Sequence, residues 1–346
     1  MEATLAVVPG EGIGPSIIDA TISVLQSAFA STGNTLCLID APSTFSRDEY
    51  GLTLDAKTRA FYNETFGAGV PILHGPAGGR FVYELRREYE LSVKHTPISP
   101  LPQISDASVV RPERLAGTDI MIVRDNASGL YQGNFGWRNE HSVAFQEASY
   151  DRASVETVVA EAVRVASERR GHLTVVTKPG GVPTISALWK SVATELASNR
   201  VDLHFLEIDN ACFQLVTSPS NFDVMVAPNM FGDVLGDTAA VLLGSRGMSY
   251  SANFSSDGRA VYQTAHGAAH DLAGRDIANP LGQILSAAWL LRHSLGFAAE
   301  ADIVEAGVSN VLAAGWRTAD VATESSRILG TRDFATKLVE AISESA

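Results

Sequence analysis

The chain has 346 residues, of which 45% are hydrophobic and 19% charged, proportions typical of a globular protein that forms one large α/β unit or two domains. A formal net charge of −13 and the absence of a basic stripe argue against nucleic acid as a partner. No apolar run is long enough to span a membrane, and Cys37 and Cys212 fit no disulfide or metal pattern. We therefore expect a cytoplasmic protein with reduced thiols.

Short apolar runs that suit β-strands alternate with amphipathic helices along the chain. The predicted strands are 5–8, 36–39, 70–73, 119–123, 172–176, 203–208 and 224–227. The predicted helices are 17–30, 154–169, 185–196, 282–295 and 301–314, with Ser154 as the N-cap of the second. This alternation indicates an α/β fold with a largely parallel, covered sheet.

Two irregular segments interrupt this order. Residues 97–112 contain four prolines and are the expected crossing between domains. Residues 132–150 are polar and aromatic without a helical period, which predicts an extended arm or hairpin that can join a partner subunit.

The segment 229–237 places Asp233 and Asp237 four residues apart, on one face of a predicted helix. Two carboxylates on adjacent turns repel each other unless a cation compensates them, and Mg²⁺ prefers such oxygen ligands. A solvated acidic helix start is the alternative. The apolar residues around the aspartates favour a position lining a cleft.

Two glycine-rich loops are candidates for ligand binding. Residues 9–15 follow the first strand and contain three glycines, although their spacing is not the Rossmann fingerprint. Residues 266–280 form a long polar loop before a buried helix, and Asp271 within it can accept hydrogen bonds from ribose hydroxyls. Either loop can also be a plain connection.

Arg86, Arg124, Tyr131 and Lys178 are single candidates for carboxylate binding or proton transfer. Taken one at a time, each is more often a structural or surface residue. Together with the loops and the aspartates, however, they follow a recognisable order. The chain resembles the β-decarboxylating dehydrogenases, the family of isocitrate, isopropylmalate, homoisocitrate and tartrate dehydrogenases, over nearly its whole length. The resemblance is strongest at 229–245 and 266–288.

The resemblance implies a role for each matching residue. Arg86 and Arg124 would bind malate carboxylates, Tyr131 would protonate the enol, and Lys178 of a neighbouring subunit would remove the hydroxyl proton. Asp209, Asp233 and Asp237 would hold Mg²⁺ or Mn²⁺, with Asp209 reaching across a dimer interface. The expected cofactor contacts are Gly12, Ile13, His266, Gly267, Asp271 and Asn279. Asp271 occupies a position where NADP-dependent members carry lysine, so NAD is favoured.

The resemblance also implies an isopropylmalate dehydrogenase-like fold with a cleft between two domains. Residues 1–96 and 245–346 would form a discontinuous cofactor-binding domain. Residues 97–244 would form the substrate, metal and dimerisation domain, including the arm near 132–150. The protein would act as a homodimer with a shared active site.

Three departures from the family pattern concern the substrate and cofactor. Thr96 stands where the family has a further arginine, and Gly180 stands where it has an asparagine near the nicotinamide. Arg80 adds a cation beside the expected β-substituent, where Lys94 and His95 can also serve an anion. Alternatively, Arg80 points to solvent or contacts cofactor phosphates.

These observations predict an NAD-dependent, metal-dependent oxidative decarboxylase of a β-substituted malate whose substituent is anionic, either isocitrate-like or phosphonate-bearing. Two alternatives stay open. One is a non-catalytic regulatory paralogue, which retention of the three aspartates, Arg124, Tyr131 and Lys178 argues against. The other is oxidation of a malate or tartrate without decarboxylation.

Overall fold

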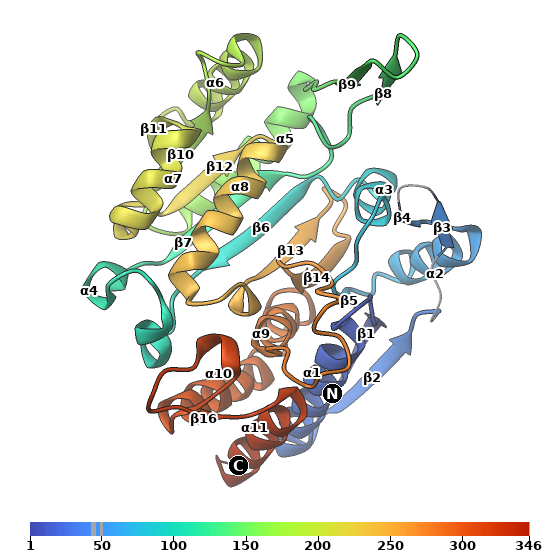
Figure 1. Ribbon diagram of the computed structural model, residues 1–346, viewed down its shortest axis with the longest axis vertical. Coiled ribbons are helices and arrows are strands. Elements are labelled where there is room, and N and C mark those ends of the chain that lie inside the picture. The colour runs from blue at the N-terminus through green and yellow to red at the C-terminus, as the bar shows by residue number, and fades with distance from the viewer. Residues whose placement is uncertain (43–45, 49–50, 346) are drawn as a thin grey trace.

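The computed structural model describes residues 1–42, 46–48 and 51–345. A single ten-stranded mixed sheet runs through the molecule, and helices cover both of its faces (Figure 1). The strand order is β11-β10-β12-β7-β6-β13-β14-β5-β1-β2. The predicted α/β class and the predominance of parallel pairing are therefore confirmed. Within the described residues of this ten-stranded sheet, antiparallel pairs occur only among β7, β6, β13 and β14.

The strands of this sheet have the following bounds: β1 Glu2–Val8, β2 Thr35–Asp40, β5 Ile72–His74, β6 Val93–Ile98, β7 Ile120–Asp125, β10 His172–Thr177, β11 Asp202–Glu207, β12 Val224–Ala227, β13 Tyr250–Phe254 and β14 Ala260–Thr264. Three small pairs stand apart from it: β3 Ser46–Asp48 with β4 Gly51–Thr53, β8 Phe135–Arg138 with β9 Val143–Gln146, and β15 Trp316–Arg317 with β16 Arg327–Ile328. The β8–β9 pair is the predicted hairpin within residues 132–150, and it projects from the body of the molecule (Figure 1).

The helices are α1 Gly14–Thr32, α2 Ala56–Gly67, α3 Phe81–Glu88, α4 Pro112–Leu115, α5 Arg152–Ser167, α6 Pro183–Ala197, α7 Ile208–Thr217, α8 Asn229–Ala240, α9 Leu281–Leu290, α10 Ala298–Ala313 and α11 Thr331–Ser345. Short 3₁₀ turns are η1 Pro102–Ala107, η2 Pro219–Asn221, η3 Val241–Leu243, η4 Arg246–Met248 and η6 Ala319–Val321, and α9 continues into a π-helical turn, Leu291–Leu295. Among the described residues, no helix combines the length and apolarity needed to cross a membrane.

Two details differ from the sequence prediction. The N-cap of α5 is Asp151, whose carboxylate accepts a hydrogen bond from the Ser154 backbone N–H at 2.9 Å, so Ser154 lies inside the helix. The strands β6, β13 and β14 lie in the middle of the sheet, yet sequence periodicity did not predict them. Pro97 and Ile98, which the sequence prediction placed at the start of the irregular segment 97–112, are the last two residues of the central strand β6.

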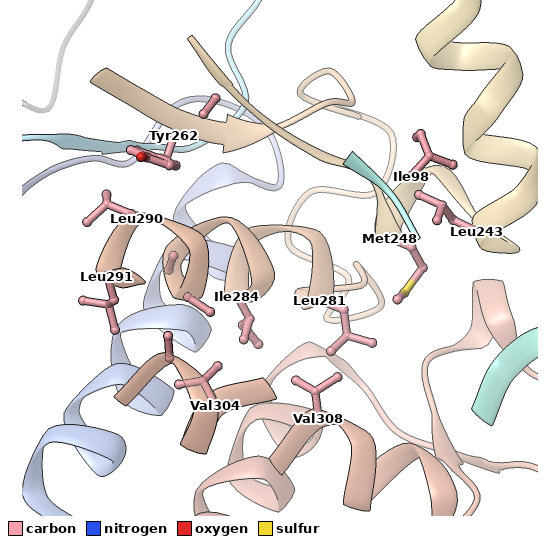
Figure 2. Packing of buried hydrophobic residues seen from close by; sticks show 14 of the residues in the cluster. Ile98, Leu243, Met248, Tyr262, Leu281, Ile284, Leu290, Leu291, Val304 and Val308 are labelled. Carbon is pink, nitrogen blue, oxygen red and sulfur yellow. The ribbon is translucent and has the colours of Figure 1, made fainter. Parts of the chain in front are cut away.

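The largest hydrophobic core lies around α9. Leu281 and Ile284 on this helix face Val304 and Val308 of α10, while Tyr262 of β14 covers the other side (Figure 2). The side chain of Ile284 is fully buried. This packing supports the strand β14 and the loop that precedes α9, which both border the candidate site.

Replacing Ile284 with Ala should lower the free energy of unfolding by about 2–5 kcal/mol, because a buried side chain is truncated and a cavity remains. Urea denaturation measures the change. Val109→Ala is the matched control, since Val109 is 87% exposed and its loss should change stability by less than about 0.5 kcal/mol. Equal stability of the two variants would contradict this account of the core.

Candidate active site

One cavity of about 510 Å³ collects most of the predicted substrate-binding residues. Arg80 and Arg86 come from the start and the last turn of α3, Lys94 from β6, Arg124 from β7 and Asp233 from α8. His74, Gln263, His266 and Gly267 line the same cavity. Five segments that are distant in the sequence therefore meet around one volume of a size suited to a small molecule.

Arg124 is the best-anchored cation of this cavity. Its Nε and Nη2 atoms donate to Asn229 Oδ1 at 3.2 and 2.7 Å, and its Nη1 atom contacts the Asp233 carboxylate. Gly232 is required beside it, since a Cβ at that position would lie 2.7 Å from Arg124 Cγ. The N-terminal part of α8 thus fits closely against the end of β7.

Three buried cations lie close together here. Arg86, Lys94 and Arg124 are only 6%, 6% and 3% exposed. Burial, reinforced by the neighbouring Arg124, lowers the pKa of Arg86 to about 9. Burial and the charges of Arg86 and Arg124 also hold the pKa of Lys94 well below its usual value. Positive charge this concentrated is stabilised by an anion that enters the cavity.

The carboxylate of Asp233 is the acidic centre of the cavity. Burial opposes its ionisation, but the charges of Arg124, Lys94 and Arg86 and the hydrogen bond from Tyr131 together outweigh this effect and lower the pKa of Asp233. The phenol of Tyr131 donates to Asp233 Oδ2 at 3.1 Å. Burial and the Asp233 charge raise the pKa of Tyr131 to about 12, so this phenol keeps its proton at neutral pH.

The predicted metal ligands are only partly brought together. Asp233 and Asp237 lie one turn apart on α8, but Asp237 is exposed and pairs with Arg246 at 2.8 Å. Asp209, at the start of α7, accepts a hydrogen bond from Lys178 Nζ at 2.8 Å. Lys178 also donates to Glu207 at 2.6 Å, and the two hydrogen bonds raise its pKa. The described part of one chain therefore supplies two carboxylates, and Asp209 and Lys178 form a separate exposed cluster.

The carboxylates nevertheless fit a hard divalent cation. Mg²⁺ and Mn²⁺ bind carboxylate oxygens together with oxygens of water or substrate, and they need few protein ligands. The Asp233 oxygens face the cavity, where Arg124 and Tyr131 contact them. Asp237 adds a second carboxylate one helical turn away, so α8 presents two of the three expected ligands.

A second cavity, of about 390 Å³, adjoins the first, because His266 and Gly267 line both. Ile13, Arg246, Asn279 and Asp320 are among its other lining residues. The Ile13 N–H donates to Ala268 O at 2.9 Å, which joins the first glycine loop to the long polar loop. A Cβ at Gly12 would lie 1.9 Å from the same oxygen, so this approach requires glycine.

One polar atom of this second cavity is available to a nucleotide. The ring atom His266 Nε2 is buried without a hydrogen-bond partner among the described residues, which leaves it ready for a ligand. Burial also lowers the pKa of His266, so the ring is neutral and able to stack or bond with a base.

Asp320, which the sequence prediction did not include, is an acidic residue that borders this cavity. Asp271 is exposed and does not line the cavity, whereas Asp320 of η6 does and accepts a hydrogen bond from Asn279 Nδ2 at 3.1 Å. Asp320 and Arg246 were missed by the sequence prediction, because neither belongs to a glycine-rich or acidic pattern. Their proximity to Asn279 appears only in the folded chain.

The comparisons with known proteins agree with this arrangement. The family model for isocitrate/isopropylmalate dehydrogenase matches residues 4–338. The chain belongs to this family. It is 35% identical to 3-isopropylmalate dehydrogenase of Halalkalibacterium halodurans over 100% of this chain and 99% of that protein. It is 36% identical to 3-isopropylmalate dehydrogenase of Anaeromyxobacter dehalogenans over 98% and 99% of the two chains.

A solved structure supports the assignment to the isocitrate/isopropylmalate dehydrogenase family. Isocitrate dehydrogenase of Methylococcus capsulatus superposes with a TM-score of 0.85 at 27% identity, covering 98% of this chain and 99% of that one. The predicted family and fold are thus confirmed. The relatives carry different substrate names, so membership of the family leaves the substrate of this chain open.

Replacing Asp233 with Asn should abolish turnover. It should also weaken Mn²⁺ binding by at least tenfold, since even the loss of a residue that only supports a metal ligand typically costs about 10- to 100-fold in affinity. The amide has the shape of the carboxylate but lacks its charge, so the fold should be retained. Paramagnetic resonance of free Mn²⁺ measures the binding. Asp302→Asn, an exposed aspartate on α10, is the control, and undiminished binding in Asp233→Asn would refute the assignment.

Proposed function

We propose that this chain catalyses the NAD-dependent, divalent-metal-dependent oxidative decarboxylation of a β-substituted malate with an anionic substituent. The observation that carries the proposal is the cavity in which Arg80, Arg86, Lys94 and Arg124 surround Asp233 next to a second, nucleotide-sized cavity. Among the described residues that line this cavity, Asp233 is the one carboxylate beside four cationic side chains. Such an excess of cations favours a ligand that carries several negative charges.

The residues divide the chemistry between them. Arg86, Arg124 and Lys94 bind the substrate carboxylates and orient the hydroxyl-bearing carbon toward the cavity shared with His266. A cation at Asp233 and Asp237 would supply Lewis-acid polarisation of the substrate oxygens, and NAD would accept the hydride. Lys178 of the partner subunit would take the hydroxyl proton in its neutral form, which requires that it first release its own proton and leave its hydrogen bonds to Asp209 and Glu207. After the loss of CO₂, Tyr131, still protonated at neutral pH, would deliver a proton to carbon.

We further propose a cytoplasmic homodimer with a shared active site. In one chain, Lys178 and Asp209 pair with each other away from the cavity, and we infer that they complete the site of a second copy. The β8–β9 hairpin exposes Trp137 and Val143, which are 59% and 43% exposed and suit burial against that copy. The division into a discontinuous domain of residues 1–96 and 245–346 and a domain of residues 97–244 remains part of this proposal.

Mixing inactive Lys178→Ala and Tyr131→Phe chains should restore activity if the site is shared. Random exchange into two-fold symmetric dimers gives about one quarter of the sites both intact residues. Steady-state rates after subunit exchange, verified by native mass spectrometry, measure the recovery. Two chains that exchange fully but stay inactive would show that each site belongs to a single subunit.

The unaltered enzyme should prefer NAD to NADP, since a carboxylate accepts hydrogen bonds from ribose hydroxyls but repels a 2′-phosphate. Asp271→Ala and Asp320→Ala should each be compared by kcat/KM for both cofactors. We expect Asp271→Ala to lower the ratio of kcat/KM for NAD to kcat/KM for NADP. An unaltered enzyme that used NADP as well as NAD would refute the proposed cofactor.

The substrate is tested with a panel of malates that carry carboxylate, phosphonate or isopropyl substituents, with NADH absorbance and CO₂ release as readouts. Loss of one charge-assisted hydrogen-bond partner, worth about 1.5–3 kcal/mol, should lower kcat/KM of Arg80→Ala for the anionic substrates roughly 10- to 150-fold. Isopropylmalate should be a poor substrate. Arg87→Ala, on the exposed side of α3, is the matched control.

Each other outcome of this panel has a definite meaning. NADH formation without CO₂ would indicate oxidation without decarboxylation. Failure of every malate, with metal and NAD still bound, would favour the regulatory paralogue. If isopropylmalate were the best substrate, or if Arg80→Ala were kinetically silent, the anionic substituent would be excluded.

A further inference from the structure

Two histidines and an aspartate meet at the outer edge of the sheet, on the strands β10 and β11 (Figure 1). His172 Nδ1 lies 3.1 Å from Asp202 Oδ2, and His204 Nε2 lies 3.0 Å from the same oxygen. One ligand atom from each of the three residues lies within 4.8 Å of those of the other two. Among the described residues, this is the one group of three or more His, Cys, Asp or Glu side chains with such a spacing.

The backbone fixes this arrangement. The parallel pairing places His172 directly opposite Asp202, and His204 follows Asp202 by two residues. Residues that are paired across strands, or two apart on one strand, project from the same face of a sheet. The backbone N–H of His172 also contacts the buried carboxylate of Asp223 at 3.3 Å, which anchors the start of β10.

Two of the separations within the cluster are close to those of a transition-metal site. Ligand atoms around a tetrahedral zinc ion lie about 3.3 Å apart, as follows from Zn–N and Zn–O bonds of roughly 2.0–2.2 Å. The two observed separations of 3.1 and 3.0 Å are close to this value.

The cluster is separate from the candidate active site. His172 and Asp202 begin β10 and β11, whereas Lys178 and Glu207 lie at the opposite ends of these strands. Six residues of extended chain separate His172 from Lys178 by roughly 20 Å. The ligand chemistry also differs, because imidazole nitrogens favour Zn²⁺, Ni²⁺ or Cu²⁺ and the carboxylates of α8 favour Mg²⁺ or Mn²⁺.

We propose that His172, Asp202 and His204 form a second metal site, which binds a divalent transition metal such as Zn²⁺ through two imidazoles and one carboxylate. All three side chains are more than half exposed, so the remaining coordination positions are open to water. Binding of the ion would cross-link the edge strand β11 to its neighbour β10. Backbone hydrogen bonds already join these two strands.

The test is a calorimetric titration of tag-free protein with Zn²⁺ in excess Mg²⁺, which occupies the oxygen-rich site. We expect one Zn²⁺ per chain and a loss of affinity of at least tenfold in His172→Ala, His204→Ala and Asp202→Asn. His141→Ala removes an exposed histidine of the β8–β9 hairpin and should leave the titration unchanged. The electron paramagnetic resonance spectrum of Cu²⁺ bound to the unaltered chain should show hyperfine splitting from two nitrogens.

Because the three side chains are exposed, the variants should keep the melting temperature of the metal-free protein, and circular dichroism verifies this. Dehydrogenase turnover with Mg²⁺ should also be unchanged in His204→Ala, so failure of this proposal is distinguishable from failure of the proposed activity. Superimposable Zn²⁺ isotherms for the unaltered chain and a His172→Ala, His204→Ala double variant would overturn the second metal site. A Cu²⁺ spectrum without nitrogen splitting would do the same.

Discussion

The contact between Arg124 and Asp233 joins residues 109 positions apart and organises the candidate site around itself. Asn229 holds the guanidinium from the start of α8, and Tyr131 bonds the other carboxylate oxygen. The close fit of Gly232 against Arg124 leaves this geometry little freedom. The site is therefore built on the junction of β7 and α8, two regular elements, and not on a flexible loop.

Charge is distributed in opposite ways inside and outside this protein. The whole chain has a net charge of −13, yet its cavity gathers four cations around one carboxylate. Burial without ion pairing is costly for a cation, so the cavity is poised for ligands that restore the balance. An acidic surface slows the approach of all anions alike. The cavity itself must therefore distinguish one anionic ligand from another.

Strand and helix alternation predicted most of the fold, but the middle of the sheet was missed. The strand β13 has the sequence Tyr-Ser-Ala-Asn-Phe, and its buried Asn253 is satisfied internally, where Asn126 donates to it at 2.8 Å and its own amide donates to Val261 O at 3.1 Å. Because buried polar residues occupy positions that are usually apolar, the strand lacks the regular apolar pattern from which strands are predicted. The four residues that the resemblance assigned to the substrate, Arg80, Arg86, Lys94 and Arg124, line one cavity. The resemblance could not show that Asp320, rather than Asp271, borders the second cavity, because that depends on how distant loops pack.

The continuous sheet limits how the cavity can change shape. Arg124 on β7 and Lys94 on β6 are directly paired, and β6 is paired in turn with β13. Strands joined in this way cannot slide apart without breaking a ladder of hydrogen bonds. Opening and closing of the cavity around a ligand therefore requires a change in the twist of the sheet. Substitutions that change the twist of β6 or β13 would then alter ligand residence time even where they contact no ligand.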